Sequence, residues 1–192
     1  MSSTMVSMTE EVRSRIVAAA DALYYARGFG QVGMDAVRDA AGVSLKAIYK
    51  EFPSKEDLII AVLELRHGMW TSGVEGRVDA IADPVERLVA VYDFLADWFC
   101  EADFRGCGFI NAFGELGGAN PRVAEAVRAH KADFQAYVAR LAEDAGAPAS
   151  LAPQLAILAE GAQVTAAIAG SAEAAAQARV AAEALIGLAL GR

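Results

Sequence analysis

The segment from Ala40 to Lys55 constrains the fold more than any other part of the chain. It reads Ala-Ala-Gly-Val-Ser-Leu-Lys-Ala-Ile-Tyr-Lys-Glu-Phe-Pro-Ser-Lys. Gly42 stands where one short helix must end and the chain must reverse, because only glycine adopts positive φ without a steric penalty on Cβ. Ser44 stands where the next helix begins, and its hydroxyl can accept a hydrogen bond from a free backbone N–H. The segment therefore predicts two short helices, at about 35–41 and 45–51, joined by a tight turn.

Two short helices with such a turn form a helix-turn-helix, whose second helix can enter the major groove of DNA. Val43, Ile48 and Phe52 are spaced to pack inward, which leaves polar and small side chains facing outward. We expect this outward set to face DNA, with Lys46 reaching a guanine edge or a phosphate and Ala47 touching a thymine methyl group. The alternative is an ordinary solvated helix face. The outward set is Ser44, Lys46, Ala47, Tyr49 and Lys50.

The segment 37–58 resembles the DNA-binding signature of the TetR family of transcriptional regulators. That signature reads apolar-Ala-x-x-Ala-Gly-Val-Ser-x-x-x-apolar-Tyr-x-x-Phe-x-Ser-Lys-x-x-Leu. The resemblance covers roughly residues 10–66, and the rest of the chain matches in helical character and length. It implies that the Tyr49 hydroxyl binds a phosphate and that Lys55, at a helix N-terminus, clamps another. The matching positions are Ala41, Gly42, Val43, Ser44, Tyr49, Phe52, Ser54, Lys55 and Leu58.

Three positions depart from the family pattern. Gly33 stands where the family has Thr or Ser, Arg38 where it has a small residue, and Lys46-Ala47 where it has Gly-Thr. Two hydroxyl groups that could contact the DNA backbone are therefore missing. Arg38 and Lys46 are the candidates to replace them, and the departures leave the operator sequence open.

The rest of the chain predicts an all-α protein, because its segments are rich in alanine, poor in β-branched residues and free of alternating strand patterns. We expect an N-terminal three-helix DNA-binding domain with a helix-turn-helix, residues 1–66, and a larger helical-bundle domain for ligand binding and dimerisation, residues 67–192. The first helix is predicted from about Ser7 or Thr9 to Gly28. The fourth is predicted to end near Trp70, where glycines follow.

The formal net charge of −8 is unusual for a protein that meets phosphate. Residues 1–66 hold 8 basic and 9 acidic side chains, so most of the acidic excess lies in the remainder. DNA binding must then depend on how a few cations are arranged, on dimerisation and on salt concentration. The same balance argues against a non-specific architectural DNA binder.

The last two predicted helices, about 153–169 and 172–190, are hydrophobic over too much of their circumference for the surface of a monomer. We interpret them as a four-helix dimer interface with two helices from each subunit. The alternative is that they form the core of the monomer. A two-fold dimer presents two recognition helices about 34 Å apart, which predicts an inverted-repeat operator.

The family resemblance implies an effector pocket among the middle helices of the larger domain. Aromatic walls with a few polar groups are typical of small-molecule sites and favour an apolar or aromatic effector. The alternative is that these side chains are satisfied core residues. The polar candidates are Asn111, Glu115, His130, Gln163 and Thr165, and the aromatic candidates are Trp98, Phe113 and Phe134.

No nucleophile–base pair, metal-ligand spacing or phosphate loop is visible, so we expect no catalytic residue, no metal, no cofactor and no enzymatic activity. Cys100 and Cys107 fit a reduced cytoplasm, and a redox role for them stays open. Charged residues interrupt the apolar run 152–190, so no membrane span is expected, and the predicted location is cytoplasmic.

The function expected from these observations is that of a ligand-responsive repressor, which binds a palindromic operator as a homodimer and leaves it when a small effector binds. The alternative is an all-α small-molecule carrier or enzyme whose DNA-binding head is vestigial. Activation in place of repression stays open, because it depends on the position of the operator.

Overall fold

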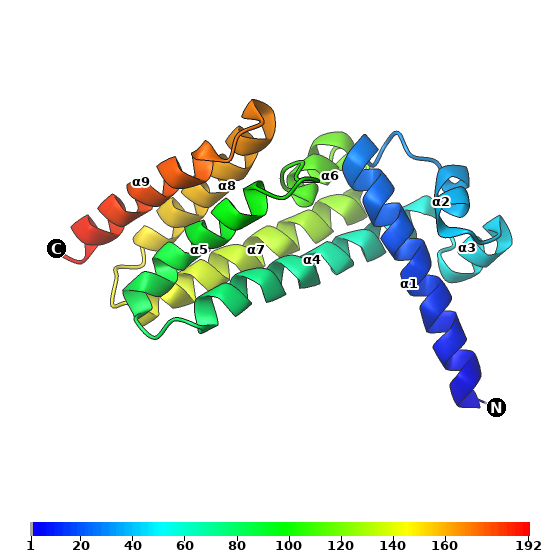
Figure 1. Ribbon diagram of the computed structural model, residues 1–192, viewed down its shortest axis with the longest axis horizontal. Helices are drawn as coiled ribbons and strands as arrows, with labels where there is room; N and C mark the ends of the chain where they lie inside the picture. The colour runs from blue at the N-terminus through cyan, green and yellow to red at the C-terminus, as the bar shows by residue number, and fades with distance from the viewer. Residues whose placement is uncertain (1) are drawn as a thin grey trace. The chain divides into compact units, whose positions relative to one another are not determined.

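The structure, a computed structural model, describes residues 2–192, and in that range it contains helices and no strands (Figure 1). This confirms the predicted all-α class. The helices are α1 (Ser2–Arg27), α2 (Met34–Ala41), α3 (Leu45–Glu51), α4 (Lys55–Asp79), α5 (Pro84–Phe99), α6 (Gly108–Leu116), α7 (Pro121–Asp144), α8 (Leu151–Ala169) and α9 (Glu173–Ala189).

The chain divides into two compact units. The first, here called the head unit, comprises the residues up to His67 together with Gly108–Val127. The second, here called the bundle unit, comprises Gly68–Cys107 and Arg128–Arg192. The segment that contains α6 therefore groups with the helix-turn-helix, and the two long helices α4 and α7 each contribute to both units.

The helix-turn-helix is built as the sequence predicts. Gly42 ends α2 with φ +63°, in the left-handed region that favours glycine. Ser44 caps α3, and its Oγ accepts a hydrogen bond from the backbone N–H of Ala47 at 3.1 Å. Ile48 is fully buried and Phe52 nearly so, which fixes the inner side of α3 against α1 and α2.

The predicted ends of two helices are wrong. α1 begins at Ser2, earlier than expected. α4 continues past Trp70 to Asp79, with Gly68, Gly73 and Gly76 inside it. Each glycine costs up to about 1 kcal/mol of helix propensity, but Val74 and Val78 are buried and outweigh that cost. At Gly73 a Cβ atom would lie 2.7 Å from the Phe94 ring, so the glycine permits a close approach.

The bundle unit is organised around α5, α8 and α9, which pack against one another. Asp83 caps α5 by accepting the N–H groups of Val85 and Glu86, so its first turn is satisfied. The buried Tyr92 hydroxyl on α5 donates to the carbonyl of Leu155 on α8 at 2.8 Å. This ties the two helices together inside an otherwise apolar core.

One face of α8 and α9 carries exposed apolar side chains. Ile157 is 70%, Ile168 83% and Leu188 80% exposed, and Val164 and Val180 are exposed as well. α8 is long and apolar enough to cross a membrane, with a mean hydropathy of 1.2, but 44% of that window is buried inside the protein. Core helices of globular proteins meet the same criterion, so α8 alone is weak support for a membrane span.

Candidate DNA-binding surface

The outward side of α3 presents a short polar surface. Lys46 and Lys50 are exposed, and Tyr49 keeps 47% of its surface accessible. Ala47 is half-buried between them and Ser44 is exposed at the cap. Buried apolar residues on the inner side of α3 hold its backbone in place, so the outward side chains start from fixed positions. Recognition of base edges and phosphates requires such fixed positions.

Arg13 of α1 supports the far end of α3. Its guanidinium lies 4.4 Å from the centre of the Phe52 ring, and its Nη1 donates to the carbonyl of Glu51 at 3.4 Å. A cation at the C-terminus of a helix compensates the partial negative charge of the last carbonyls. Sequence reasoning missed Arg13, because nothing in the local pattern of α1 shows that it meets a segment 38 residues away.

Arg38 on α2 is engaged by carboxylates. Its guanidinium lies 2.6 Å from Asp35 and 2.7 Å from Asp39, and its side chain is 35% exposed. The hydrogen bond to Asp39 raises the pKa of Arg38. To contact a phosphate, Arg38 exchanges these partners, which lowers the net gain from such a contact.

Lys55, at the start of α4, lies against the turn between α1 and α2. Its Nζ donates to the carbonyl of Gly30 at 3.2 Å and lies 5.9 Å from the centre of the Tyr24 ring. Burial lowers the pKa of Lys55, and the charge of Glu115 opposes that shift. The structure thus places the predicted phosphate clamp within an intramolecular network.

Ser54 and Asp57 form a reciprocal cap at the start of α4. The Asp57 N–H donates to Ser54 Oγ at 3.1 Å, and the Ser54 N–H donates to Asp57 Oδ2 at 3.1 Å. Hydrogen bonds from Ser54, followed by one from Arg122, hold the pKa of the Asp57 carboxyl below its usual value. The sequence Ser-x-x-Asp before an apolar run is the signal for such a cap.

The expected effector residues are distributed over both units. Asn111, Phe113 and Glu115 lie on α6 in the head unit, where Phe113 is 44% exposed. The other five lie in the bundle unit, where His130, Phe134 and Gln163 are buried and Trp98 is half-buried. The Gln163 side chain donates to the carbonyl of Ala159 in its own helix at 3.3 Å.

Trp70 gathers part of this set in the bundle unit. Its ring centre lies 5.0 Å from Phe134, 5.5 Å from His130 and 6.2 Å from Phe94, in edge-to-face arrangements. Sequence reasoning missed Trp70 because it placed the end of α4 there. The available signal was the four-residue spacing from Trp70 to Val74 and Val78, which puts all three on one helix face.

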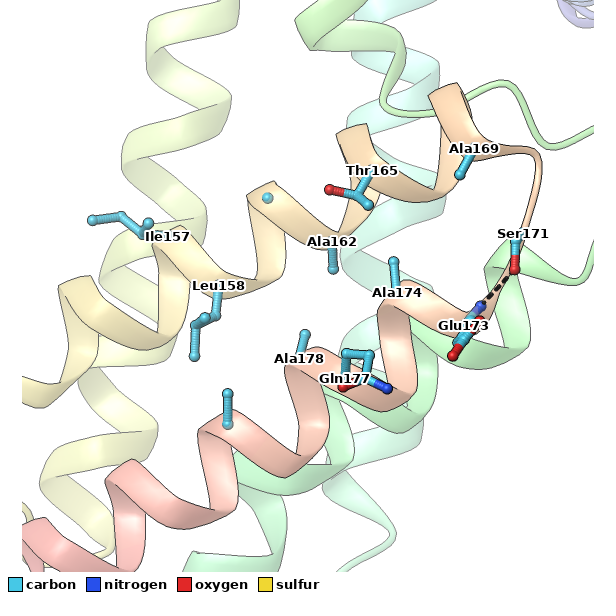
Figure 2. Close-up of a pocket in the computed structure, with 12 residues that line it drawn as sticks. Ile157, Leu158, Ala162, Thr165, Ala169, Ser171, Glu173, Ala174, Gln177 and Ala178 are labelled. Atoms are coloured by element: carbon cyan, nitrogen blue, oxygen red, sulfur yellow. Dashed lines mark hydrogen bonds between the residues drawn. The ribbon is translucent and has the colours of Figure 1, made fainter.

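Thr165 lies apart from this aromatic group, exposed on α8. It lines an open hollow of about 580 Å³ between α8 and α9, whose walls are mostly apolar. Leu158 and Ala162 of α8 point into this space, opposite Ala174 and Ala178 of α9 (Figure 2). Thr165 therefore belongs to the outer face of these helices, next to the exposed apolar side chains.

The two cysteines differ in environment. Cys100 is exposed, whereas Cys107 is buried and its Sγ lies 3.8 Å from the ammonium of Lys131. Lys131 also pairs with Glu160 at 3.6 Å. In the part of the chain that the structure describes, no group of three or more His, Cys, Asp or Glu side chains could hold a metal ion.

Comparison with known proteins matches two separate stretches of the chain. Residues 16–62 match the family model described as bacterial regulatory proteins, tetR family. Residues 84–182 match the model described as tetracyclin repressor-like, C-terminal domain. The chain is also 32% identical over 149 residues to the HTH-type transcriptional activator FasR of Mycolicibacterium smegmatis, a match that covers 77% of this chain and 67% of FasR.

Solved structures show the same fold. SCO4454, a TetR-family transcriptional regulator from Streptomyces coelicolor, matches with a TM-score of 0.86 and 26% identity, over 94% of this chain and 96% of that one. A tetR-type regulator from Streptomyces avermitilis matches with a TM-score of 0.75 and 30% identity, over 90% and 98%. With its helix-turn-helix and both family models matched, this chain belongs to the TetR family of bacterial transcriptional regulators.

Proposed function

We propose that this chain is a ligand-responsive repressor that binds an inverted-repeat operator as a homodimer and is released by a small apolar or aromatic effector. The observation that carries this proposal is the outward side of α3. Lys46, Tyr49 and Lys50 are exposed there on a helix that is anchored by the fully buried Ile48. Arg38, Ser44, Ala47 and Lys55 complete the proposed DNA-binding set.

The proposed dimer uses the outer face of α8 and α9. Ile157, Ile168 and Leu188 are each at least 70% exposed and lie on the same pair of helices. Exposed apolar side chains of this size favour association, because burial in an interface removes them from water. A two-fold dimer carries two copies of α3, which is why the proposed operator is an inverted repeat.

The proposed effector contacts are the buried aromatic and polar side chains of the bundle unit, where Trp70 meets His130 and Phe134. Trp98 and Gln163 are further candidates, as are Asn111, Phe113, Glu115 and Thr165. Aromatic rings beside an imidazole suit an apolar or aromatic compound with one polar group. The effector releases DNA only if it binds the free and the DNA-bound states with different affinity.

In this proposal residues 1–66 bind DNA, residues 67–192 bind the effector and dimerise, and the segment with α6 packs with the head. The protein acts in the cytoplasm, and neither a cofactor nor a catalysed reaction is part of the mechanism. Repression is the simplest outcome, because a dimer on its operator excludes other proteins from that DNA. The similarity to FasR, which is named an activator, favours activation as a second candidate.

Selection of bound sequences from a random DNA pool tests the proposal. The purified protein at moderate salt is expected to enrich an inverted repeat. Transcription from a promoter that carries this repeat then distinguishes repression from activation, because a repressor lowers transcript yield and an activator raises it. A folded protein that enriches no sequence, with or without candidate effectors, contradicts DNA recognition and favours the carrier or enzyme alternative.

A further inference from the structure

The turn between α1 and α2 is shaped around a carboxylate from α6. The N–H of Gly30 donates to Glu115 Oε2 at 2.8 Å. A Cβ atom at Gly28 would lie 3.0 Å from the same oxygen, and one at Gly30 would lie 3.4 Å from it. Gly28 also has φ +95°, so a side chain there is strained by the backbone conformation and crowds the Glu115 carboxylate.

Lys55 makes a second hydrogen bond to the backbone of this turn. Glu115 accepts from the N–H of Gly30, while Lys55 donates to the carbonyl of the same residue at 3.2 Å. The two side chains attract each other as opposite charges. Glu115, Gly30 and Lys55 thus form one three-part contact, here called the Gly30 clamp, that joins α6, the α1–α2 turn and the start of α4.

The segment after α6 adds further ties to the start of α4. Asn120 Nδ2 donates to Glu56 Oε2 at 2.7 Å, and Arg122 Nη1 lies 2.6 Å from Glu56 and 2.9 Å from Asp57. Arg122 is 54% exposed, so its ion pairs are solvent-screened and individually weak. The clamp differs from them, because its two hydrogen bonds hold the backbone N–H and carbonyl groups of Gly30.

The Gly30 clamp lies at both borders of the helix-turn-helix. Gly30 precedes the start of α2 at Met34 by four residues, and Lys55 follows the end of α3 at Glu51 by four residues. A shift of the turn or of the Lys55 backbone therefore moves one end of the α2–α3 pair. Placement within a fraction of an ångström matters for contacts to phosphates and base edges.

We propose that Glu115 is a positioning residue for DNA binding, which acts through Gly30 and Lys55 to set the placement of α2 and α3. This inference rests on the proposed DNA-binding function and adds to it a residue on α6 that touches no DNA. Loss of the carboxylate leaves the turn and Lys55 without a shared anchor. The bound arrangement is then sampled less often, and the apparent affinity falls in proportion.

The test is titration of the selected operator with full-length protein carrying Glu115→Ala, Glu115→Gln, Lys55→Gln or the double change Glu115→Ala/Lys55→Gln. The matched control is Glu125→Ala, which removes an exposed carboxylate from the same unit. Removing negative charge generally favours DNA binding, so the control is expected to bind equally well or slightly more tightly. Stoichiometric titration gives the active fraction of each variant, and thermal unfolding gives its Tm.

We expect Glu115→Ala to weaken binding by about five- to tenfold at an unchanged active fraction. Glu115→Gln should lose less, because its amide oxygen still accepts from Gly30. The double variant should bind the operator only slightly more weakly than the weaker-binding single variant, since the two side chains act through one contact. A merely structural role predicts a lower Tm and active fraction with normal affinity for the active molecules.

Three titration results overturn this inference alone and leave the DNA-binding proposal standing. Affinity of Glu115→Ala equal to that of Glu125→Ala removes the positioning role. Tighter binding by Glu115→Ala than by the control shows that Glu115 competes with phosphate for Lys55. Fully additive losses in the double variant show that the two residues act separately. Failure of the unsubstituted protein to bind any operator contradicts the DNA-binding proposal itself, and with it this inference.

Discussion

The chain has two exposed surfaces of opposite chemistry. On α3 the exposed side chains are two lysines and Tyr49, set on a helix of only 7 residues. On α8 and α9 they include branched aliphatics such as Ile168 and Leu188, set on helices of 19 and 17 residues. A short cationic surface suits a ligand with regularly spaced negative charges, whereas a long apolar face suits a partner with a similar apolar face. The difference agrees with the two partners proposed above, DNA for the first surface and a second copy of the chain for the second.

The largest effect is expected from a charge on the apolar face. Ile168→Glu or Leu188→Glu places an unpaired carboxylate in the proposed dimer interface, where it costs several kcal/mol, so the dimer dissociation constant should rise at least about 100-fold. Light scattering at several concentrations measures the mass. Ala136→Glu, on an exposed position of α7, is the matched control and should stay dimeric. A dimer that persists in both interface variants places the interface elsewhere.

The next effect tests the polar surface. Tyr49→Ala removes an exposed aromatic side chain with a hydroxyl from α3, and operator affinity should fall about tenfold or more with Tm unchanged. Phe113→Ala is the matched control, because Phe113 is exposed to a similar extent, 44% against 47%, but lies on α6. Equal affinity for both variants in the absence of effector would contradict the assignment of α3 as the recognition helix.

A smaller effect separates charge from base recognition on α3. If Lys46 binds a phosphate, Lys46→Ala lowers the slope of log affinity against log salt concentration by about one per half-site and weakens all sequences alike. If Lys46 reads a guanine, the variant instead tolerates other bases at one operator position. Titrations at three or more salt concentrations, with operator and scrambled DNA, distinguish these outcomes. No change in either quantity removes Lys46 from the interface.

The smallest effect concerns acid stability at the start of α4. The pKa of Asp57 is depressed by hydrogen bonds from Ser54 and then Arg122, so this carboxylate stabilises the fold above its unfolded-state pKa near 3.8. That contribution is lost as the pH falls through the lower pKa of the folded state. Asp57→Asn should therefore flatten the decline of Tm below about pH 4 by a few degrees at most. Asp103→Asn, in an exposed loop, is the control.

The helix-turn-helix could be predicted from sequence because its determinants are local. Gly42 and Ser44 act on groups within a few residues, through a left-handed φ and a hydrogen bond to Ala47. The end of α4 could not be predicted, because it depends on packing between segments far apart in sequence. At Gly73, for example, the Phe94 ring of α5 lies too close for a Cβ atom. Local propensity favours ending the helix there, and tertiary packing overrides it.

For the candidate effector site, the sequence indicates which types of residue to consider but not where their side chains lie. Polar side chains on apolar helices were selected, but their surroundings depend on packing between segments far apart in sequence. Gln163 bonds within its own helix, Thr165 lies on an outer face, and Glu115 meets a glycine 85 residues away. Trp70, which collects the aromatic rings in the bundle unit, was not selected because its helix was expected to end beside it.

The Gly30 clamp also makes one amide group a natural reporter. Gly30 is an exposed residue outside any helix, and its N–H is hydrogen-bonded to the Glu115 side chain of α6. The amide hydrogen of Gly30 therefore exchanges with solvent at a rate set by how often its hydrogen bond to Glu115 opens, rather than by unfolding of a helix. One amide NMR signal of isotope-labelled protein, followed as operator or effector is added, would report the state of α6 without a probe attached to the protein.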